Sequence, residues 1–317
     1  MRYFSVPGGL GLPVSGRFLF ARMVSEVQGL HRERPIDLIH AHAALPCGHA
    51  ALLLGRELGI PFVVTVHGLD AFFTRQVKGP AGWLCRTTCK QVYRSARKVI
   101  CISEKVRDEV LLEVEASTRV IYNGVDTSAF APPEAPQASV VVLSVGNLIP
   151  TKGHELLLRA FANIQRQNPD VLCQMIGNGP EQSRLSQLAG ELGIASRVEF
   201  LGRKSRQEVA DAVKRCTVFA LPSRYEGLGC VYLEAMSAGK PVIACRGQAI
   251  EEIIQHQKNG WLIGPEDLAA MTEAMSRLLN DSHLRQEIGV SARRTVEQYS
   301  FAHQAAELTQ LYRECLA

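Results

Sequence analysis

Short apolar runs alternate with stretches of helical periodicity along nearly the whole chain. Each run has the length of a strand that is buried on both faces. The runs lie at residues 36–40, 62–66, 98–102, 119–122, 140–145, 171–176, 197–201, 217–221 and 241–244. Strand-sized apolar runs separated by helices are typical of βαβ units, in which the strands are parallel. The pattern therefore predicts an α/β protein built from parallel sheets.

A proline-rich stretch separates the runs into two series. Three prolines within residues 131–136 leave little room for a helix or a strand, as expected of a linker. We predict two Rossmann-like domains, at residues 1–135 and 136–299, whose ligands gather in the cleft at the carboxyl ends of the strands. Residues 300–317 are amphipathic at helical spacing, which by itself indicates a helix that docks on other structure.

Two glutamates, Glu226 and Glu234, stand eight residues apart around a glycine-rich turn. The apolar run before them ends at a proline, and residues 230–238 favour a helix that stops at Gly239. A helix would thus begin beyond the carboxyl end of a strand, where its free N–H groups and its dipole suit a phosphate. The alternative is a strand-helix unit whose acids only cap and solvate the helix.

Composition narrows the class of protein. With 317 residues and 46% hydrophobic content the chain can form two cores, and a net charge of +4 is too small to indicate nucleic acid as a partner. Nine scattered cysteines without a C-x-x-C pair favour reduced thiols in the cytoplasm. The sequence has neither an apolar run of about eighteen residues nor a secretory signal.

Seven motifs follow one another in order along the chain. They are D-L-I-H-A-H at 37–42, T-V-H-G-L-D at 65–70, I-Y-N-G-V-D at 121–126, G-N-L-I-P-T-K-G at 146–153, M-I-G-N-G-P-E at 175–181, V-E-F-L-G at 198–202 and E-x7-E-A-M-S-A-G-K-P-V at 226–242. The ordered set resembles the retaining glycosyltransferases of family 4, also called glycosyl transferases group 1, which have the GT-B fold. The resemblance implies two Rossmann-like domains that face a central cleft, and a terminal helix that packs back on the N-terminal domain.

The implied activity is transfer of a sugar, with retention, from a nucleotide-diphosphate sugar to a glycan or lipid-linked acceptor in polysaccharide or glycolipid biosynthesis. By resemblance Glu234 would accept hydrogen bonds from the ribose hydroxyls, and Glu226 would contact hydroxyls of the transferred sugar. The backbone amides of Gly229, Cys230 and Val231 would hold diphosphate or sugar oxygens.

A departing diphosphate needs positive charge, which Lys152 is placed to supply. The family pairs this lysine with an arginine five residues earlier, where this chain has Asn147. An amide donates hydrogen bonds but carries no charge, so part of the stabilisation must come from elsewhere.

Four further residues are expected on the nucleotide side. Gly177 and Gly179 would allow the ribose or base to approach the backbone, while Gly202 and Arg203 lie where the family reads the base. The alternative is that these are ordinary turn glycines.

His67, at the end of an apolar run, would by resemblance touch the donor sugar near the reaction centre, and Asp70 shares its loop. We expect His40 and His42 to face opposite sides of a strand and so to make a poor metal pair. No Asp-x-Asp occurs, so we expect a metal-independent reaction without a cofactor. A front-face departure of the diphosphate is favoured on family grounds, since no clear carboxylate nucleophile is available.

The N-terminal domain is shorter than in the family, with only 36 residues before Asp37. We interpret it as truncated, which would leave a bare sheet edge and put activity in doubt. Alternatively, residues 6–11 are the family's glycine-rich loop and residues 14–30 its helix. The short domain and Asn147 keep a second function open, a nucleotide-sugar-binding remnant without activity. A further alternative is a GT-B nucleotide-sugar epimerase, which the ordered motif set disfavours.

Between Asp70 and Glu104 there are basic residues but no acids. A spacing of four places three cations on one helix face, with aromatic and apolar residues just upstream, as on a protein that binds an anionic membrane surface from the cytoplasmic side. The alternative is a solvated basic face. The residues concerned are Arg86, Lys90 and Arg94, preceded by Phe72, Phe73, Trp83 and Leu84.

Overall fold

The computed structural model describes residues 11–68, 77–133 and 139–317, and the chain forms two compact units. The first unit consists of Met1–Tyr122 and Gln304–Ala317, and the second of Asn123–His303. Residues 134–136 of the proline-rich stretch lie outside the described residues. Within the described ranges, no helix is both long and apolar enough to cross a membrane.

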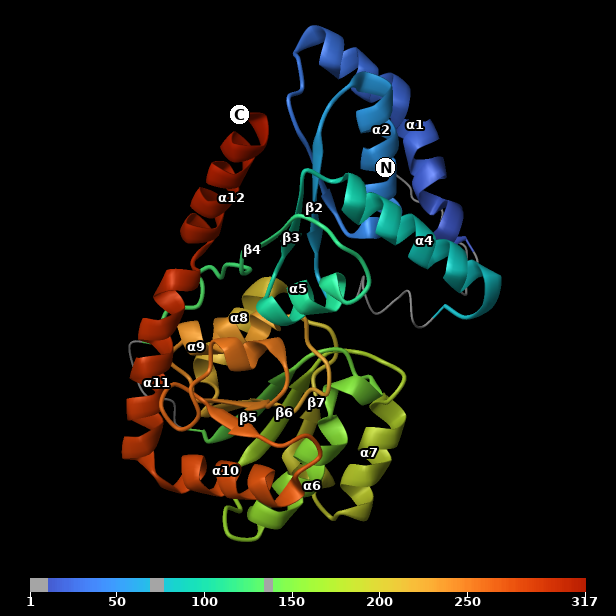
Figure 1. The fold of residues 1–317 in the computed structure, drawn as a ribbon. Helices are drawn as coiled ribbons and strands as arrows, with labels where there is room; N and C mark the ends of the chain where they lie inside the picture. Colours follow the sequence, from blue (N-terminus) through green and yellow to red (C-terminus); the bar gives the residue numbers. More distant parts are fainter. Residues whose placement is uncertain (1–10, 69–76, 134–138) are drawn as a thin grey trace. The chain divides into compact units, whose positions relative to one another are not determined.

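The first unit is built on a four-stranded parallel sheet (Figure 1), with strand order β1-β2-β3-β4. Its strands are β1 (Ile39–His42), β2 (Phe62–Val66), β3 (Lys98–Cys101) and β4 (Thr118–Val120). Its helices are α1 (Leu12–Glu33), α2 (His49–Leu58), α4 (Gly79–Ser95) and α5 (Glu104–Leu111), together with the short turn η2 (Ala44–Gly48). Helix α1 packs on α2 and α4, and it contains the helix expected over residues 14–30. Strand β2 is buried along its whole length, as its β-branched sequence favours.

The terminal helix α12 (Phe301–Leu316) completes the core of the first unit. Leu311 and Cys315 are buried there against Val63, Ile100 and Ile121 of the sheet region. Apolar positions at helical spacing therefore cover one face of the first sheet.

A six-stranded parallel sheet forms the second unit, with strand order β10-β9-β8-β5-β6-β7. The strands are β5 (Val141–Val145), β6 (Leu172–Ile176), β7 (Val198–Phe200), β8 (Val218–Leu221), β9 (Val242–Cys245) and β10 (Trp261–Ile263). The chain runs outward from β5 to β7, returns to place β8 on the other side of β5, and continues to β10. The strand order thus reverses between β5 and β8, which is where ligands bind in open α/β sheets.

Helices cover the second sheet. They are α6 (His154–Gln165), α7 (Gln182–Glu191), α8 (Arg206–Arg215), α9 (Cys230–Ser237), α10 (Leu268–Asn280) and α11 (Ser282–Val296), with 3-10 turns η3 (Pro150–Lys152), η4 (Ala195–Arg197), η5 (Ala249–Glu252) and η6 (Glu297–Tyr299). Helix α10 packs on α6, and α9 packs on α8 and α11. The core joins Leu157 and Phe161 of α6 with Met271 and Leu278 of α10.

Candidate active site

Two loops meet where the strand order of the second sheet reverses. One follows β5 and carries η3, and the other follows β8 and leads into α9. They are neighbours because β5 pairs with β8. Side chains from two distant parts of the sequence therefore converge at the expected ligand position.

Lys152 and Glu226 form an ion pair at this point. The Lys152 Nζ lies 2.5 Å from the Glu226 Oε1, and the glutamate is only 8% exposed. The Ser223 hydroxyl donates to the same carboxylate oxygen at 2.9 Å, and the Glu226 N–H donates to the Gln248 Oε1 at 3.0 Å. A buried carboxylate is stable only when it is paired and hydrogen-bonded, and here both conditions are met. The sequence predicted the two charged residues but not their contact, nor Ser223 and Gln248.

Two glycines allow close packing in these loops, Gly153 against the backbone of the other loop and Gly229 against a ring at the start of α9. Gly153 has a φ of +71°, and a Cβ there would lie 2.1 Å from the carbonyl oxygen of Pro222. Gly229 has a φ of +79°, and a Cβ there would lie 2.5 Å from the ring of Tyr232. That ring is fixed because its hydroxyl donates to the carbonyl of Leu221 at 2.7 Å. Neither glycine can be replaced without moving a loop of the site.

Helix α9 begins at Cys230, directly after Gly229, and no side chain caps its start. The first N–H groups of a helix have no intrahelical acceptor, so the amides of Cys230 and Val231 are free of helical hydrogen bonds. The Asn123 side-chain amide donates to the Cys230 Sγ at 3.5 Å. The backbone amides of Gly229, Cys230 and Val231, which the sequence predicted as oxygen ligands, are consecutive at a helix start that no side chain caps. Such a helix start favours the binding of an anion.

Glu234 is the fifth residue of α9 and is half-buried. Burial raises the pKa of its carboxyl group from 4.5 to about 7, although the nearby positive charge of Arg206 partly opposes the shift. Within the part of the chain that the structure describes, no hydrogen bond to this carboxylate is formed. A partly desolvated acceptor without a donor is unfavourable in the fold and is typical of a functional site.

Asn147 has an exposed side chain, and only its backbone takes part in the loop structure. The carbonyl oxygen of Asn147 lies 3.3 Å from the Nε2 of His154 and accepts from the N–H of Ile149 at 2.9 Å. His154 is buried, and burial lowers the pKa of its imidazole to about 4, so the ring is neutral. The chain therefore has an uncharged, solvent-facing amide where the family has an arginine. Sequence reasoning missed His154, whose position directly after Lys152-Gly153 was the available signal.

Two glycines that were predicted to border the nucleotide, Gly177 and Gly179, are required by the packing of the backbone. A Cβ on Gly177 would lie 1.9 Å from the carbonyl oxygen of Gly146, and one on Gly179 would lie 2.2 Å from that of Leu148. The Gly177 N–H donates to the Gly202 carbonyl at 2.9 Å, which joins the loops after β6 and β7. Arg203, next in the chain, is exposed.

His67 follows β2 in the first unit and contacts a second histidine. Its Nε2 lies 2.9 Å from the Nδ1 of His42. The rings of His40 and His42 stack with centroids 4.6 Å apart, so the prediction that they face opposite sides of the strand was wrong. Residues i and i+2 of a strand point to the same face. Asp70 lies outside the described residues.

The three rings stack rather than converge on one point. Among the described residues, no group of three or more histidine, cysteine, aspartate or glutamate side chains is arranged to hold a metal ion.

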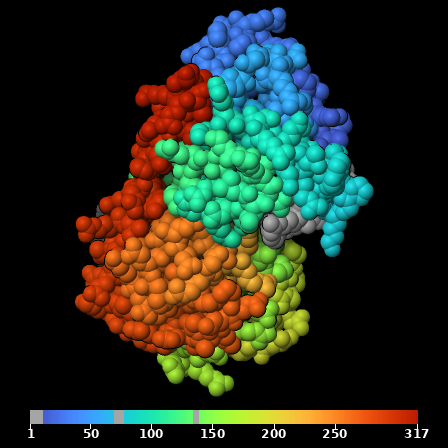
Figure 2. Space-filling model, in the orientation of Figure 1, coloured from blue at the N-terminus to red at the C-terminus, as the bar shows by residue number. Residues whose placement is uncertain are grey.

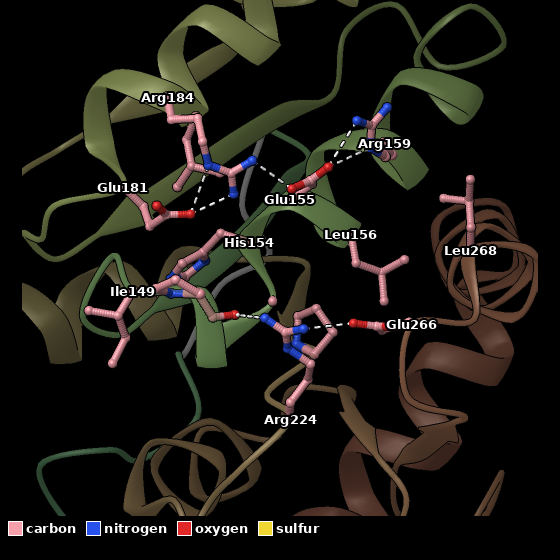
Figure 3. Close-up of a pocket in the computed structure, with 14 residues that line it drawn as sticks. Ile149, His154, Glu155, Leu156, Arg159, Glu181, Arg184, Arg224, Glu266 and Leu268 are labelled. Atoms are coloured by element: carbon pink, nitrogen blue, oxygen red, sulfur yellow. Dashed lines mark hydrogen bonds and ion pairs between the residues drawn. The ribbon is translucent and has the colours of Figure 1, made fainter. Parts of the chain in front are cut away.

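A separate cavity of about 400 Å³ opens in the second unit (Figure 3). Its charged side chains pair with one another: Arg184 contacts Glu181 at 2.5 Å and Glu155 at 2.7 Å, and Arg224 contacts Glu266 at 2.7 Å. None of the site residues predicted from the sequence lines it. The cavity borders the Lys152 loop, however, because Arg224 donates from its side chain to the carbonyl of Pro150 at 2.8 Å and from its backbone to that of Thr151 at 2.7 Å.

Comparison with known proteins covers both halves of the chain. The family model for glycosyl transferases group 1 matches residues 126–295, and the model for glycosyltransferase family 4 matches residues 3–129. An uncharacterized glycosyltransferase of Methanocaldococcus jannaschii is 31% identical over 280 residues, which are 88% of this chain and 76% of that protein. A GDP-mannose-dependent α-(1-6)-phosphatidylinositol monomannoside mannosyltransferase of Mycolicibacterium smegmatis is 28% identical, over 91% of this chain and 79% of that protein.

Solved structures show the same architecture. Sucrose-phosphate synthase from Thermosynechococcus elongatus superposes with a TM-score of 0.78 at 25% identity, over 94% of this chain and 79% of that one. HepE from Anabaena, in complex with UDP and glucose, superposes with a TM-score of 0.81 at 23% identity, over 98% of this chain and 84% of that one.

Proposed function

Because the chain belongs to the glycosyl transferases of group 1 and has the GT-B fold, we propose that it is a retaining, metal-independent hexosyltransferase that acts on a glycan or lipid-linked acceptor. The family and the fold predicted from the sequence are confirmed, and glycosyl transfer from a nucleotide sugar follows from them. The observation that carries the finer proposal is the Lys152–Glu226 ion pair beside the uncapped start of α9.

The ion pair suits a donor that carries both negative charge and hydroxyl groups. In the proposed mechanism the diphosphate takes Lys152 as its counter-ion, and the amides of Gly229, Cys230 and Val231 hold its remaining charge. Glu226, released from the lysine, then accepts hydrogen bonds from hydroxyls of the sugar. Because Lys152 alone replaces the family's cationic pair, the helix start has a larger share of the leaving-group stabilisation than in relatives with an arginine at position 147.

Glu234 completes the donor site in this proposal. Two ribose hydroxyls would supply the hydrogen-bond donors that its carboxylate lacks among the described residues. Gly177, Gly179, Gly202 and Arg203 border the nucleotide in the same scheme.

Retention is proposed to occur by departure and attack on the same face of the sugar. Double displacement needs a carboxylate that is available to attack the anomeric carbon, whereas in this proposal Glu226 accepts hydrogen bonds from the sugar hydroxyls and from Ser223. In the front-face reaction the leaving diphosphate takes the proton of the acceptor hydroxyl, so no protein nucleophile is required. We assign His67, and Asp70 three residues later in the sequence, to the donor sugar near the reacting bond.

Calorimetric titration of the full chain with UDP-, GDP- and ADP-sugars tests the donor site. We expect Glu234→Ala to weaken donor binding by about 10-fold or more, since hydrogen bonds to a charged group contribute about 1.5–3 kcal/mol. Glu226→Gln should keep nucleotide binding and lose sugar transfer. Glu199→Gln is the control, because Glu199 is an exposed glutamate of the same unit, on β7. Full activity of Glu234→Ala would refute this site.

A second function, nucleotide-sugar binding without transfer, is favoured by one observation, the uncharged Asn147. The two functions differ in a single measurement, the release of nucleoside diphosphate when donor and acceptor extracts are supplied. Binding of a donor without release at any enzyme concentration would identify a binding protein.

The outer face of α4 supports a proposal about the acceptor. Helix α4 lies at the surface (Figure 2, cyan). Trp83 is 64% exposed, Arg86 and Arg94 are exposed on the same helix, and Lys90 pairs with Glu113 at 3.3 Å. We propose that this face binds anionic lipid on the cytoplasmic side of a membrane. The name of the mycobacterial relative, which specifies a phosphatidylinositol-based acceptor, supports a lipid-linked substrate.

Flotation with phosphatidylglycerol vesicles tests the membrane proposal, with phosphatidylcholine vesicles as the neutral control. Substitution of Trp83 and Arg86 by alanine should reduce binding to the anionic vesicles. Equal recovery with both lipids, or none with either, would exclude an anionic membrane as the partner.

A further inference from the structure

Three histidines of the first unit form a continuous stack that ends at His67. The rings of His40 and His42 lie 4.6 Å apart at an angle of 26°, and those of His42 and His67 lie 5.2 Å apart at 20°. The His42 Nδ1 is also 2.9 Å from the His67 Nε2, which is a hydrogen bond between two imidazoles. The ring of His67, which is assigned to the donor sugar, is thus held by His42 through both ring contact and a hydrogen bond.

The other end of the stack is held by the C-terminal segment. The His40 Nδ1 lies 2.5 Å from the hydroxyl of Tyr312, and its Nε2 lies 2.7 Å from the Oγ1 of Thr65. Tyr312 is next to Leu311, which is buried in the core of the same unit. His40 therefore has a partner at each ring nitrogen, one from β2 and one from α12.

Hydrogen bonding determines the tautomers of these rings. A neutral imidazole donates at one ring nitrogen and accepts at the other. Two neutral rings therefore share a hydrogen bond only when one of the two facing nitrogens carries a proton and the other does not. Burial lowers the pKa of His67, and burial followed by the charges of His42 and His67 lowers the pKa of His40 to about 4. At neutral pH both rings are thus neutral, and the proton on each one is placed by its neighbours.

We infer that His42 is the positioning residue of His67, and that Tyr312 holds the stack in place through His40. The inference rests on the proposed function, since it gives His42 and Tyr312 a role toward a residue that is itself assigned to the donor sugar. The hydrogen bond from His42 would fix both the ring orientation and the tautomer of His67, the residue assigned to the substrate.

The expected effect is on the rate and not on donor binding. Misplacement of a reacting group by about 1 Å can lower a rate about 100-fold, so we expect His42→Ala to lower kcat by roughly 10–100-fold. The KM for the donor should stay within about twofold, because the proposed nucleotide contacts lie in the second unit. His42→Asn should recover part of the loss, since the amide of asparagine lies where Nδ1 lies in histidine.

Nuclear magnetic resonance of the full chain, labelled with ¹⁵N at the histidine ring nitrogens, tests the inference independently of activity. We expect His42→Ala to shift the ring nitrogens of His67, and Tyr312→Phe to shift those of His40. Thr309→Val is the matched control, since Thr309 is exposed on the same helix and its hydroxyl bonds only the helix carbonyl of Ala305 among the described contacts. It should shift neither set, and a spectrum of His67→Asn assigns the signals.

Activity is measured in parallel as release of nucleoside diphosphate from the panel of nucleotide sugars. Unchanged His67 ring signals in His42→Ala would overturn the inference whether or not the protein is active. Shifted signals with a wild-type kcat would overturn the positioning role of His42. If the wild-type chain turns over no donor while the ring signals shift as expected, the contact stands and the proposed function fails.

Discussion

Glu234 should lower the stability of the protein at alkaline pH, because burial opposes its ionisation. Its pKa is raised from 4.5 to about 7 in the fold. Between these values the folded protein binds the proton more tightly than the unfolded chain does. The resulting stability is fully present below pH 4.5 and is lost as the pH rises through 7. Since one pKa unit corresponds to about 1.4 kcal/mol, the loss is about 1 kcal/mol at pH 5.5 and about 3 kcal/mol at pH 8.

Glu234→Gln removes this penalty, because an amide of the same shape does not ionise. The variant should be more stable than the wild type at pH 8, by up to about 3 kcal/mol, and the difference should shrink towards pH 5.5. For a unit of this size the gain corresponds to a rise in Tm of roughly 5–10 °C. The same variant should lose donor binding, so a donor should raise the Tm of the wild type alone.

Differential scanning calorimetry across pH 5.5 to 8.5 measures the effect on the transition of the second unit. Glu208→Gln provides a control of opposite sign. Glu208 is the third residue of α8 and forms a capping box with the N-cap residue Ser205. Hydrogen bonds from Ser205 lower the pKa of Glu208 to about 2, so its stabilisation is present above the unfolded pKa and is lost in acid. That variant should have a lower Tm at pH 8. A Tm difference for Glu234→Gln that is negative, or that does not change with pH, would refute the reasoning.

Three further changes probe the same site. Lys152→Gln should lower turnover by roughly 100-fold or more, and it should lower the Tm at neutral pH because Glu226 is left buried without its cation; donor turnover and calorimetry measure the two effects. Asn147→Arg should raise turnover and donor affinity by restoring the family's second cation at an exposed position, whereas an unchanged Kd would remove position 147 from the phosphate site. Gly153→Ala should destabilise the fold by more than about 1 kcal/mol in chemical denaturation, since its Cβ would lie 2.1 Å from the Pro222 carbonyl oxygen.

Local sequence patterns predicted the strands β1 to β9, but they missed β10 (Trp261–Ile263), whose three apolar residues are too short a run to indicate a strand. The run of β-branched residues at Phe62–Val66 and the glycine-rich turn before α9 each contain their own signal within a few residues. Contacts between distant residues had no such signal. Lys152 and Glu226 are 74 residues apart, and His40 and Tyr312 are 272 apart. Only the packing of the sheets brings these pairs together.

The residues that sequence reasoning missed share a physical feature. Ser223, Gln248 and His154 are neutral polar side chains, which are common in buried positions throughout proteins and indicate no chemistry by type. Their importance arises from the site residues that they contact, because Ser223 donates to the carboxylate of Glu226, Gln248 accepts from the Glu226 N–H, and His154 contacts the carbonyl of Asn147. The error over His40 and His42 was of another kind, since strand periodicity alone places residues i and i+2 on one face.

The proposed donor site combines two kinds of unfavourable charge. Glu234 is partly desolvated without a donor to its carboxylate among the described residues, while Lys152 and Glu226 are desolvated together and neutralise one another. A nucleotide sugar offers groups that address both, since its ribose hydroxyls can donate to Glu234 and its diphosphate can take over Lys152. Binding then exchanges one ion pair for another and adds hydrogen bonds to the Glu234 carboxylate, which accepts none from the described residues. The net affinity should therefore depend more on the ribose and the sugar hydroxyls than on the phosphate charge. The uncharged Asn147 is consistent with a site in which hydrogen bonds to hydroxyl groups contribute more to affinity than charge on the phosphates.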